Sequence, residues 1–134
     1  MKTVFTNGCF DILHPGHILF LKEAKLLGDL LIVGLNSDYS VSELKPGRPI
    51  NGQLHRRLML EALDSVDLVI VFDEPTPAKL IYDIRPSVIV KGSDYTLNDI
   101  AGADAVRSWG GSVEILQITP GFSTTSLLDR IKKS

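Results

Sequence analysis

Short apolar runs alternate with segments of helical periodicity along most of this chain. The runs are rich in β-branched and large aliphatic residues, and they lie at 4–5, 30–35, 68–71, 88–90 and 113–116. The run at 30–35 has the character of a strand that is buried on both faces of a parallel sheet. Strands that alternate with helices form a parallel sheet with helices on both faces. The sequence therefore predicts an α/β fold: a doubly wound, Rossmann-like domain with five parallel strands.

The first turn of this pattern, TNGCFDILHPGH at 6–17, has the features of a phosphate site. Pro15 suits the first turn of a helix, because that position needs no amide donor. The unpaired amides of such a turn, together with the helix dipole, favour a bound anion. His14 and His17 stand three residues apart and can face the same side. Gly16 between them lets a ligand approach the backbone, so the turn suits a triphosphate.

The residues of this turn also allow other interpretations. The two histidines could bind a metal or be structural, but the only other histidine is His55, and we predict no protein metal site. Cys9 could be a catalytic thiol, but no partner base is indicated. We therefore favour Cys9 as a small packing residue.

The segment KPGRP at 45–49 is a loop that carries two cations, Lys45 and Arg48. It could be an ordinary solvated basic loop. Its position beyond the carboxyl end of the strand at 30–35 favours a phosphate-binding or lid role instead. The prolines and glycine predict a loop that is mobile in the free protein, although Arg48 could serve as its structural anchor.

A second turn with a cation directly follows the strand at 88–90. Lys91 could be solvated and Asp94 could simply form the turn. Right-handed crossovers, however, bring the turns that follow parallel strands to one edge of the sheet. Lys91, Gly92 and Asp94 are therefore expected at the same sheet edge as the first turn, which favours contact with a ligand.

The last turn, at 119–125, precedes a helix predicted over 126–132. Ser123 and Thr124 are hydroxyl residues at the start of that helix. Such hydroxyls usually cap a helix, and they can bind phosphate as well. The adjacent Gly121 favours both roles at once.

The composition argues against several function classes. The chain has the size of one domain, residues 1–134, and its formal charge of -2 argues against a nucleic-acid-binding surface. One cysteine permits no internal disulfide, so we expect a reducing, cytoplasmic location. We expect neither a signal peptide nor a membrane partner, because no apolar run is long enough to span a bilayer.

The string from Gly8 to His17 resembles the signature of the cytidylyltransferase-like nucleotidyltransferases. Stretches at 45–49, 91–95 and 121–125 match as well. Together they most resemble the heptose-1-phosphate adenylyltransferase domain of lipopolysaccharide-core synthesis. The resemblance covers nearly the whole chain and implies strand order 3-2-1-4-5, which places the first and fourth strands side by side.

The resemblance implies transfer of a nucleoside monophosphate from a nucleoside triphosphate to a sugar phosphate. It assigns the catalytic roles to His14, His17, Lys45 and Lys91. It assigns nucleotide binding to Gly8, Cys9, Phe10, Asp11, Gly16, Arg48, Arg56, Gly92, Asp94, Gly121, Phe122, Ser123 and Thr124. Mg²⁺ would accompany the triphosphate, and family members commonly form homodimers.

Two positions depart from related patterns. The family often has an acidic residue where this chain has Leu54, two positions before Arg56. Glycerol-3-phosphate cytidylyltransferases usually carry an arginine where this chain has Ile118. The Ile118 position and the stretches at 91–95 and 121–125 favour the heptose enzymes, and with them ATP over CTP. A CTP-dependent enzyme of the glycerol-3-phosphate type is one alternative, and a nucleotide-binding module without turnover is another. No sugar kinase sequence is present, so we expect a separate kinase upstream.

Overall fold

The computed structural model describes residues 1–117 and 131. The elements, in chain order, are β1 (Thr3–Gly8), α1 (Pro15–Lys25), β2 (Leu30–Asn36), α2 (Asp38–Leu44), α3 (Gln53–Glu61), β3 (Leu68–Phe72), α4 (Ala78–Ile84), β4 (Val88–Gly92), the 3₁₀ turn η1 (Leu97–Asp99), α5 (Ala103–Ser108) and β5 (Ser112–Leu116). The turn expected at 119–125 and the helix expected over 126–132 lie outside the described residues.

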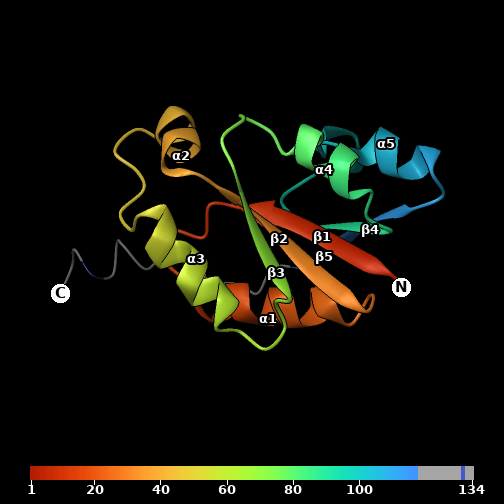
Figure 1. The fold of residues 1–134 in the computed structure, drawn as a ribbon, viewed down its shortest axis with the longest axis horizontal. Coiled ribbons are helices and arrows are strands. Elements are labelled where there is room, and N and C mark those ends of the chain that lie inside the picture. Colours follow the sequence, from red (N-terminus) through yellow and green to blue (C-terminus); the bar gives the residue numbers. More distant parts are fainter. Residues whose placement is uncertain (118–130, 132–134) are drawn as a thin grey trace.

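The five strands form one parallel sheet in the order β3-β2-β1-β4-β5 (Figure 1). This confirms the predicted doubly wound α/β fold and the order that the resemblance implied. The order reverses between β1 and β4, which are neighbours. Ligands of open α/β sheets bind at such a switch point, beyond the carboxyl ends of the strands.

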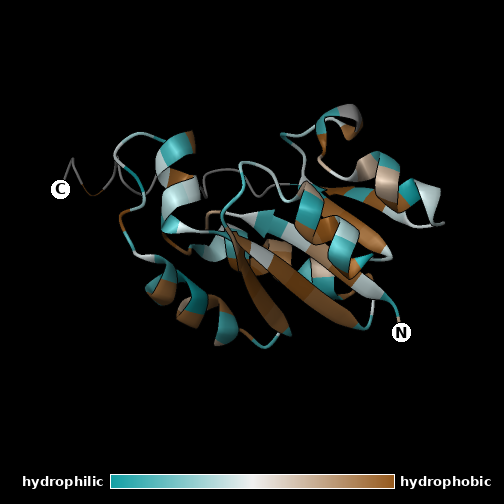
Figure 2. Ribbon diagram, turned by 45° about the horizontal axis from the view of Figure 1, so that its top comes forward, coloured by the Kyte–Doolittle hydropathy of each residue, from teal (hydrophilic) through white to brown (hydrophobic). Residues whose placement is uncertain are grey.

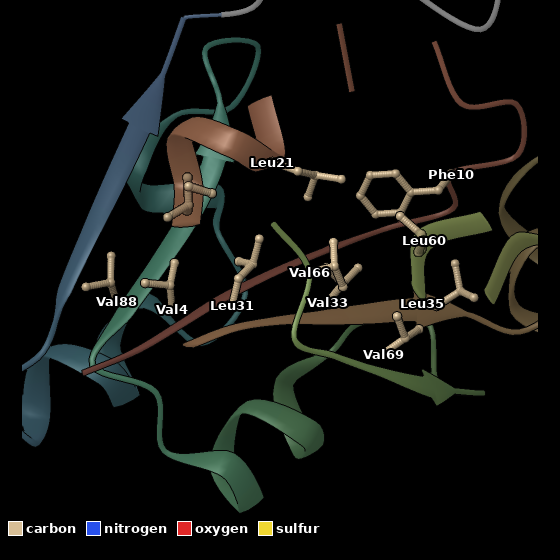
Figure 3. Packing of buried hydrophobic residues seen from close by; sticks show 12 residues of the cluster. Val4, Phe10, Leu21, Leu31, Val33, Leu35, Leu60, Val66, Val69 and Val88 are labelled. Carbon is tan, nitrogen blue, oxygen red and sulfur yellow. The ribbon is translucent and has the colours of Figure 1, made fainter. Parts of the chain in front are cut away.

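Alternate residues of each strand enter two hydrophobic cores, one on each face of the sheet. Val4 and Leu31 pack with residues of α1 and α3, and Figure 3 shows this core from close by. Phe5 and Ile32 pack with residues of α4 and α5 on the opposite face. Because successive side chains point to opposite faces, every second residue of a strand lies on the same face of the sheet. The same alternation decides which face the polar residues at the strand ends occupy.

Local signals set two of the helix starts as expected. Pro15 is the first residue of α1, and Ser37 caps α2 by accepting a hydrogen bond from the Ser40 amide at 3.1 Å. The spacing of the apolar residues over 18–27 predicts an amphipathic helix that ends at Gly28, but the helix ends at Lys25. Leu26, which that pattern places on the apolar face, is 84% exposed.

Helix α3 departs in part from its sequence pattern, in which Leu54, Leu58 and Leu60 are the apolar positions and Arg56 and Arg57 the polar ones. Leu60 is fully buried, but Leu54 and Leu58 are 70% and 59% exposed. Arg56 is 1% exposed. A charged residue is buried in this way only when its hydrogen bonds are satisfied by the protein, and the contacts of Arg56 described below satisfy them.

The hydrophobic residues concentrate in the strands, whereas the helices carry mixed surfaces (Figure 2). Within the described part of the chain, no helix has the length and apolar character needed to cross a membrane.

Candidate functional site

A cavity of about 680 Å³ opens at the carboxyl edge of the sheet, where β1 and β4 lie side by side. Most of the site residues expected from the sequence line it. These are Gly8, Cys9, Phe10, Asp11, His14, Gly16, His17, Lys45, Arg48, Lys91, Gly92 and Asp94. Arg56 is not among the lining residues. Gly121, Phe122, Ser123 and Thr124 lie outside the described residues.

His14 is oriented by the backbone of the helix that it begins. Its Nδ1 accepts a hydrogen bond from the Gly16 amide at 3.1 Å, which makes His14 the N-cap of α1. Burial lowers the pKa of His14. With Nδ1 acting as an acceptor, the proton of the neutral ring lies on Nε2. His14 therefore offers one N–H donor beyond the start of the helix.

His17 stacks on His14, with 3.7 Å between ring centroids, and meets the Phe10 ring edge-on at 5.3 Å. Burial lowers the pKa of His17 to about 4, with further contributions from His14 and Lys45. The ring is therefore neutral at physiological pH. Its Nδ1 is buried and has no hydrogen-bond partner among the described residues. A bound group that pairs with this atom would remove the cost of leaving it unpaired.

Asp11 anchors the basic loop to the signature turn. Its carboxylate accepts hydrogen bonds from the Ile50 amide at 2.9 Å and the Asn51 amide at 2.8 Å, and it pairs with Arg48. Burial alone would raise the pKa of Asp11, but the two amides and the Arg48 guanidinium outweigh it, so the pKa is lowered. The carboxylate is thus occupied by the protein itself.

This anchor corrects the expectation that the loop of 45–49 is not pinned in the free protein, because Arg48 and the residues just after the loop are held by Asp11. Arg48 thus has the contacts of the structural anchor that the sequence left open as an alternative. Asp11 lines the cavity and its side chain supports the loop. Lys45 differs from Arg48: it is exposed and has no ion pair among the described residues.

Arg56 serves as a second anchor. Its guanidinium donates to the carbonyl oxygens of Asn51 at 2.8 Å, Cys9 at 2.8 Å and Asn36 at 2.7 Å, and to Asp38 Oδ1 at 2.9 Å. The side chain is 0% exposed. This geometry leaves no face of the guanidinium for nucleotide, which corrects the expected direct contact. Arg56 instead ties the signature turn to the end of β2 and to the loop.

Lys91 reaches the cavity from β4. Its Nζ donates to the Asn7 carbonyl at 3.0 Å and to Asn7 Oδ1 at 3.3 Å, and it lies 4.4 Å from the centre of the Tyr95 ring. Burial lowers the pKa of Lys91 to about 8, and the nearby Asp94 partly offsets this. Lys91 is therefore a cation at neutral pH that loses its proton within the accessible range.

Several polar residues of this site were not identified from the sequence as ligand-binding candidates, Asn7 and Asn36 among them. Asn7 and Asn36 both line the cavity. Both lie near the end of a strand, an even number of residues after Phe5 and Ile32, which point to the α4/α5 face. Lys91 follows Ile89 in the same way, so all three polar side chains lie on that face. Their position at a strand end was the available signal. That signal also fits a capping or turn residue, so it did not separate them from their neighbours.

The described residues contain no group of three or more His, Cys, Asp or Glu side chains arranged to hold a metal ion.

Comparison with known proteins agrees with this geometry. Residues 5–129 match the family described as Cytidylyltransferase-like. The chain is 51% identical over 134 residues to the "Bifunctional protein HldE" of Geobacter sulfurreducens, covering 99% of this chain and 27% of the relative. It is 54% identical over 130 residues to the protein of the same name from Marinomonas sp., covering 96% and 27%. The chain thus spans about a quarter of the length of these curated relatives.

Two solved structures are also similar. The lipopolysaccharide core biosynthesis protein of Thermoplasma volcanium matches with a TM-score of 0.71 and 33% identity, covering 89% of this chain and 97% of that one. A pantoate-beta-alanine ligase of Francisella tularensis, solved with β-γ ATP and β-alanine, matches with a TM-score of 0.66 and 17% identity, covering 96% and 65%. The latter likeness shows a shared fold.

Proposed function

The chain belongs to the cytidylyltransferase-like family, and from this we propose that it transfers AMP from ATP to a sugar phosphate such as heptose 1-phosphate, with release of pyrophosphate. The observation that carries the proposal is the stacked pair of His14 and His17 at the start of α1, inside a cavity that Lys45 and Lys91 also line. The sequence identity of 51% and 54% to two HldE proteins, over nearly the whole chain, supports it. So does the lipopolysaccharide core protein at 33% identity.

The reaction needs positioning and charge stabilisation more than proton transfer. A phosphate oxygen of the sugar phosphate attacks the α-phosphate of ATP, and the bond to pyrophosphate breaks in line. The attacking phosphate is already ionised near neutral pH, so no general base is required. Catalysis then depends on donors aimed at the oxygens on which charge develops.

The neutral histidines suit this role. Each imidazole can donate one N–H to a phosphate oxygen, and the N-cap bond at Gly16 keeps the donor of His14 outside the helix. The stacked, buried geometry favours neutral rings, because two imidazolium ions at this separation would repel each other. The donors are therefore in place before the substrate arrives, which reduces reorganisation in the transition state.

The cations complete the proposed arrangement. Lys45 would contact the triphosphate from the loop, and Lys91 would hold a phosphate from the β4 side. Arg48 would act mainly by keeping the loop in place. We propose that Ser123 and Thr124, beside Gly121 and Phe122, bind the β- and γ-phosphates. This part of the proposal rests on the family resemblance alone.

Further parts of the proposal concern the surroundings of the reaction. Mg²⁺ would enter with the triphosphate, held by phosphate oxygens and water, and would neutralise phosphate charge. We propose a cytoplasmic location, supported by the single cysteine, and a homodimer, supported only by the family.

A matrix of nucleoside triphosphates against sugar and polyol phosphates, scored by pyrophosphate release, tests the proposed function. We expect ATP with heptose 1-phosphate to give the highest kcat/KM. A preference for CTP with glycerol 3-phosphate would identify the alternative cytidylyltransferase. Nucleotide binding without release of pyrophosphate from any pair would instead identify a module without turnover.

The two cations of the basic loop should respond differently to substitution. Lys45→Ala should raise the KM for ATP by about 10- to 100-fold, as expected for loss of one charge-assisted hydrogen bond. Its unfolding free energy should change by no more than about 0.5 kcal/mol, because the side chain is exposed. Arg48→Ala should cost about 1–3 kcal/mol of stability, because it leaves the buried Asp11 carboxylate without its cation. Steady-state kinetics and thermal unfolding of both variants distinguish the roles, and equal stability losses would contradict them.

Lys91 predicts an alkaline limit to activity. In the free enzyme its pKa of about 8 means that the cation is lost as the pH rises through 8, so kcat/KM should fall above that pH. Lys91→Arg should retain activity to higher pH, since the guanidinium stays charged. Stability should change in the opposite direction. Between about pH 8 and 10.5 the unfolded state holds a proton that the folded state has lost, so stability rises with pH. A wild-type pH profile identical to that of Lys91→Arg would contradict the assignment.

A further inference from the structure

Asn36 is a buried polar residue in the cavity wall whose side chain is held in one orientation. It is the last residue of β2, is 4% exposed, and lines the cavity. Its backbone carbonyl oxygen accepts a hydrogen bond from the Arg56 guanidinium at 2.7 Å. Its Nδ2 donates to Ser40 Oγ at 3.0 Å, and that hydroxyl lies 3.0 Å from the carbonyl oxygen of Glu74.

This chain of hydrogen bonds determines which end of the amide is free. A carbonyl oxygen only accepts, so the single proton of the Ser40 hydroxyl points to Glu74. Ser40 Oγ must then accept from Asn36, which places the NH₂ group of the amide toward Ser40. The Oδ1 atom of Asn36 is left without a hydrogen-bond partner among the described residues. An acceptor oxygen thus remains on a nearly buried side chain at the cavity wall.

The chemistry of that oxygen restricts its partner. An ionised phosphate has no donor to offer and would be repelled, so the partner carries an O–H or N–H group. Asn36 ends the strand next to β1, and β1 leads into the histidine turn, so the two strand ends are about 5 Å apart. In both proposed substrates the groups next to the reacting phosphates are sugar hydroxyls, whereas the base lies beyond the ribose.

We propose that Asn36 Oδ1 is a specificity-determining acceptor for a sugar hydroxyl, on the α4/α5 side of the cavity and opposite the histidines. The inference rests on the proposed function, because the sugar is either the ribose of the nucleotide or the acceptor sugar. Ser40 acts as a positioning residue that holds the amide in its orientation. A site that binds a hydroxyl through an acceptor on a nearly buried side chain discriminates against the corresponding deoxy compound, since the bound deoxy compound leaves that acceptor unpaired.

The test compares each hydroxyl substrate with its deoxy analogue. The nucleotide arm uses ATP, 2′-deoxy-ATP and 3′-deoxy-ATP, and the acceptor arm uses heptose 1-phosphate and its single-position deoxy analogues. For the wild type we expect kcat/KM to favour the hydroxyl compound by about 5- to 100-fold in one arm. Asn36→Ala should bring that ratio close to one. Ser40→Ala should reduce it in part, and it also serves if Asn36→Ala does not fold.

The matched control is Ser42→Ala, on helix α2, which also carries Ser40. Ser42 is exposed and its hydroxyl donates to the Tyr39 carbonyl of its own helix, so this variant should keep the wild-type ratio. An unchanged ratio in Asn36→Ala and Ser40→Ala, in both arms, would overturn the inference. The inference would also be overturned if Asn36→Ala lost discrimination only between ATP and a triphosphate that lacks the amino group of adenine. The partner of Oδ1 would then be the base and not a sugar hydroxyl.

Calorimetric dissociation constants for the same compounds separate this inference from the proposed function. Absence of pyrophosphate release by the wild type would contradict the function. The ratio of dissociation constants for hydroxyl and deoxy compounds would still report on Asn36. Loss of that ratio in Asn36→Ala would support the acceptor role, and its persistence in both arms would refute it.

Discussion

Replacement of His17 by alanine is expected to lower kcat by about 10²- to 10³-fold while leaving the protein folded. This is the usual cost of removing one donor that stabilises charge in a transition state. The ring is neutral, and its buried Nδ1 has no partner among the described residues, so its removal should change stability by no more than about 1 kcal/mol. Pyrophosphate release and thermal unfolding of the purified variant test both parts. Near-normal kcat in a folded variant would refute the assigned role.

The other two histidines provide internal controls. His55→Ala should have wild-type activity, because His55 is exposed on α3 and does not line the cavity. His14→Ala should lose activity and also about 1 kcal/mol of stability, because His14 caps α1 through Nδ1. His14→Asn should recover the stability, since asparagine is a good N-cap, without recovering the activity.

Replacement of Arg56 by alanine is expected to have the largest effect on stability, about 3–5 kcal/mol, with a fall in Tm on the order of 10 °C or more. The substitution removes the donors for the carbonyl oxygens of Cys9, Asn36 and Asn51 and leaves them without these hydrogen bonds. An unpaired buried carbonyl costs its full desolvation penalty. Chemical denaturation gives the free energy of unfolding of the variant. Pyrophosphate release, measured at denaturant concentrations below the unfolding transition, reports whether the signature turn is still competent.

Arg57 offers a matched control on the same helix. Its guanidinium forms a partly exposed i,i+4 pair with Glu61 at 3.5 Å. Such surface pairs contribute little, so Arg57→Ala should change the unfolding free energy by no more than about 0.5 kcal/mol. If the two substitutions cost the same, Arg56 would not be the anchor described here.

Much of the fold and part of the candidate site could be predicted because their signals are local. The run at 30–35 is apolar on both faces, which indicates a buried strand, and Pro15 favours the start of a helix. Neither signal depends on residues that are distant in the sequence. The spacing of His14 and His17 places both rings on one side of a turn by helix geometry alone. Parallel strands then bring Lys91 to the same edge by topology.

The roles of Asp11 and Arg56 could not be predicted, since their partners are distant in sequence. Asp11 is held by amides 39 and 40 residues away, and Arg56 binds a carbonyl oxygen 47 residues away. A periodic pattern treats an arginine on a helix as surface and leucines as core. Here backbone carbonyl oxygens from three segments satisfy the guanidinium, so Arg56 is buried while Leu54 and Leu58 are exposed.

The sequence by itself determined the parallel α/β architecture and the histidine turn at its carboxyl edge, because periodicity, proline placement and strand–helix alternation act over a few residues. Only the tertiary structure decided which polar side chains face the cavity and which support it. Arg48 and Asp11 pair with each other, Lys45 has no ion pair among the described residues, and Asn36 is held by Ser40. Each of these outcomes depends on whether a hydrogen-bond partner arrives from another segment, since a buried polar group must be paired wherever that partner lies in the chain.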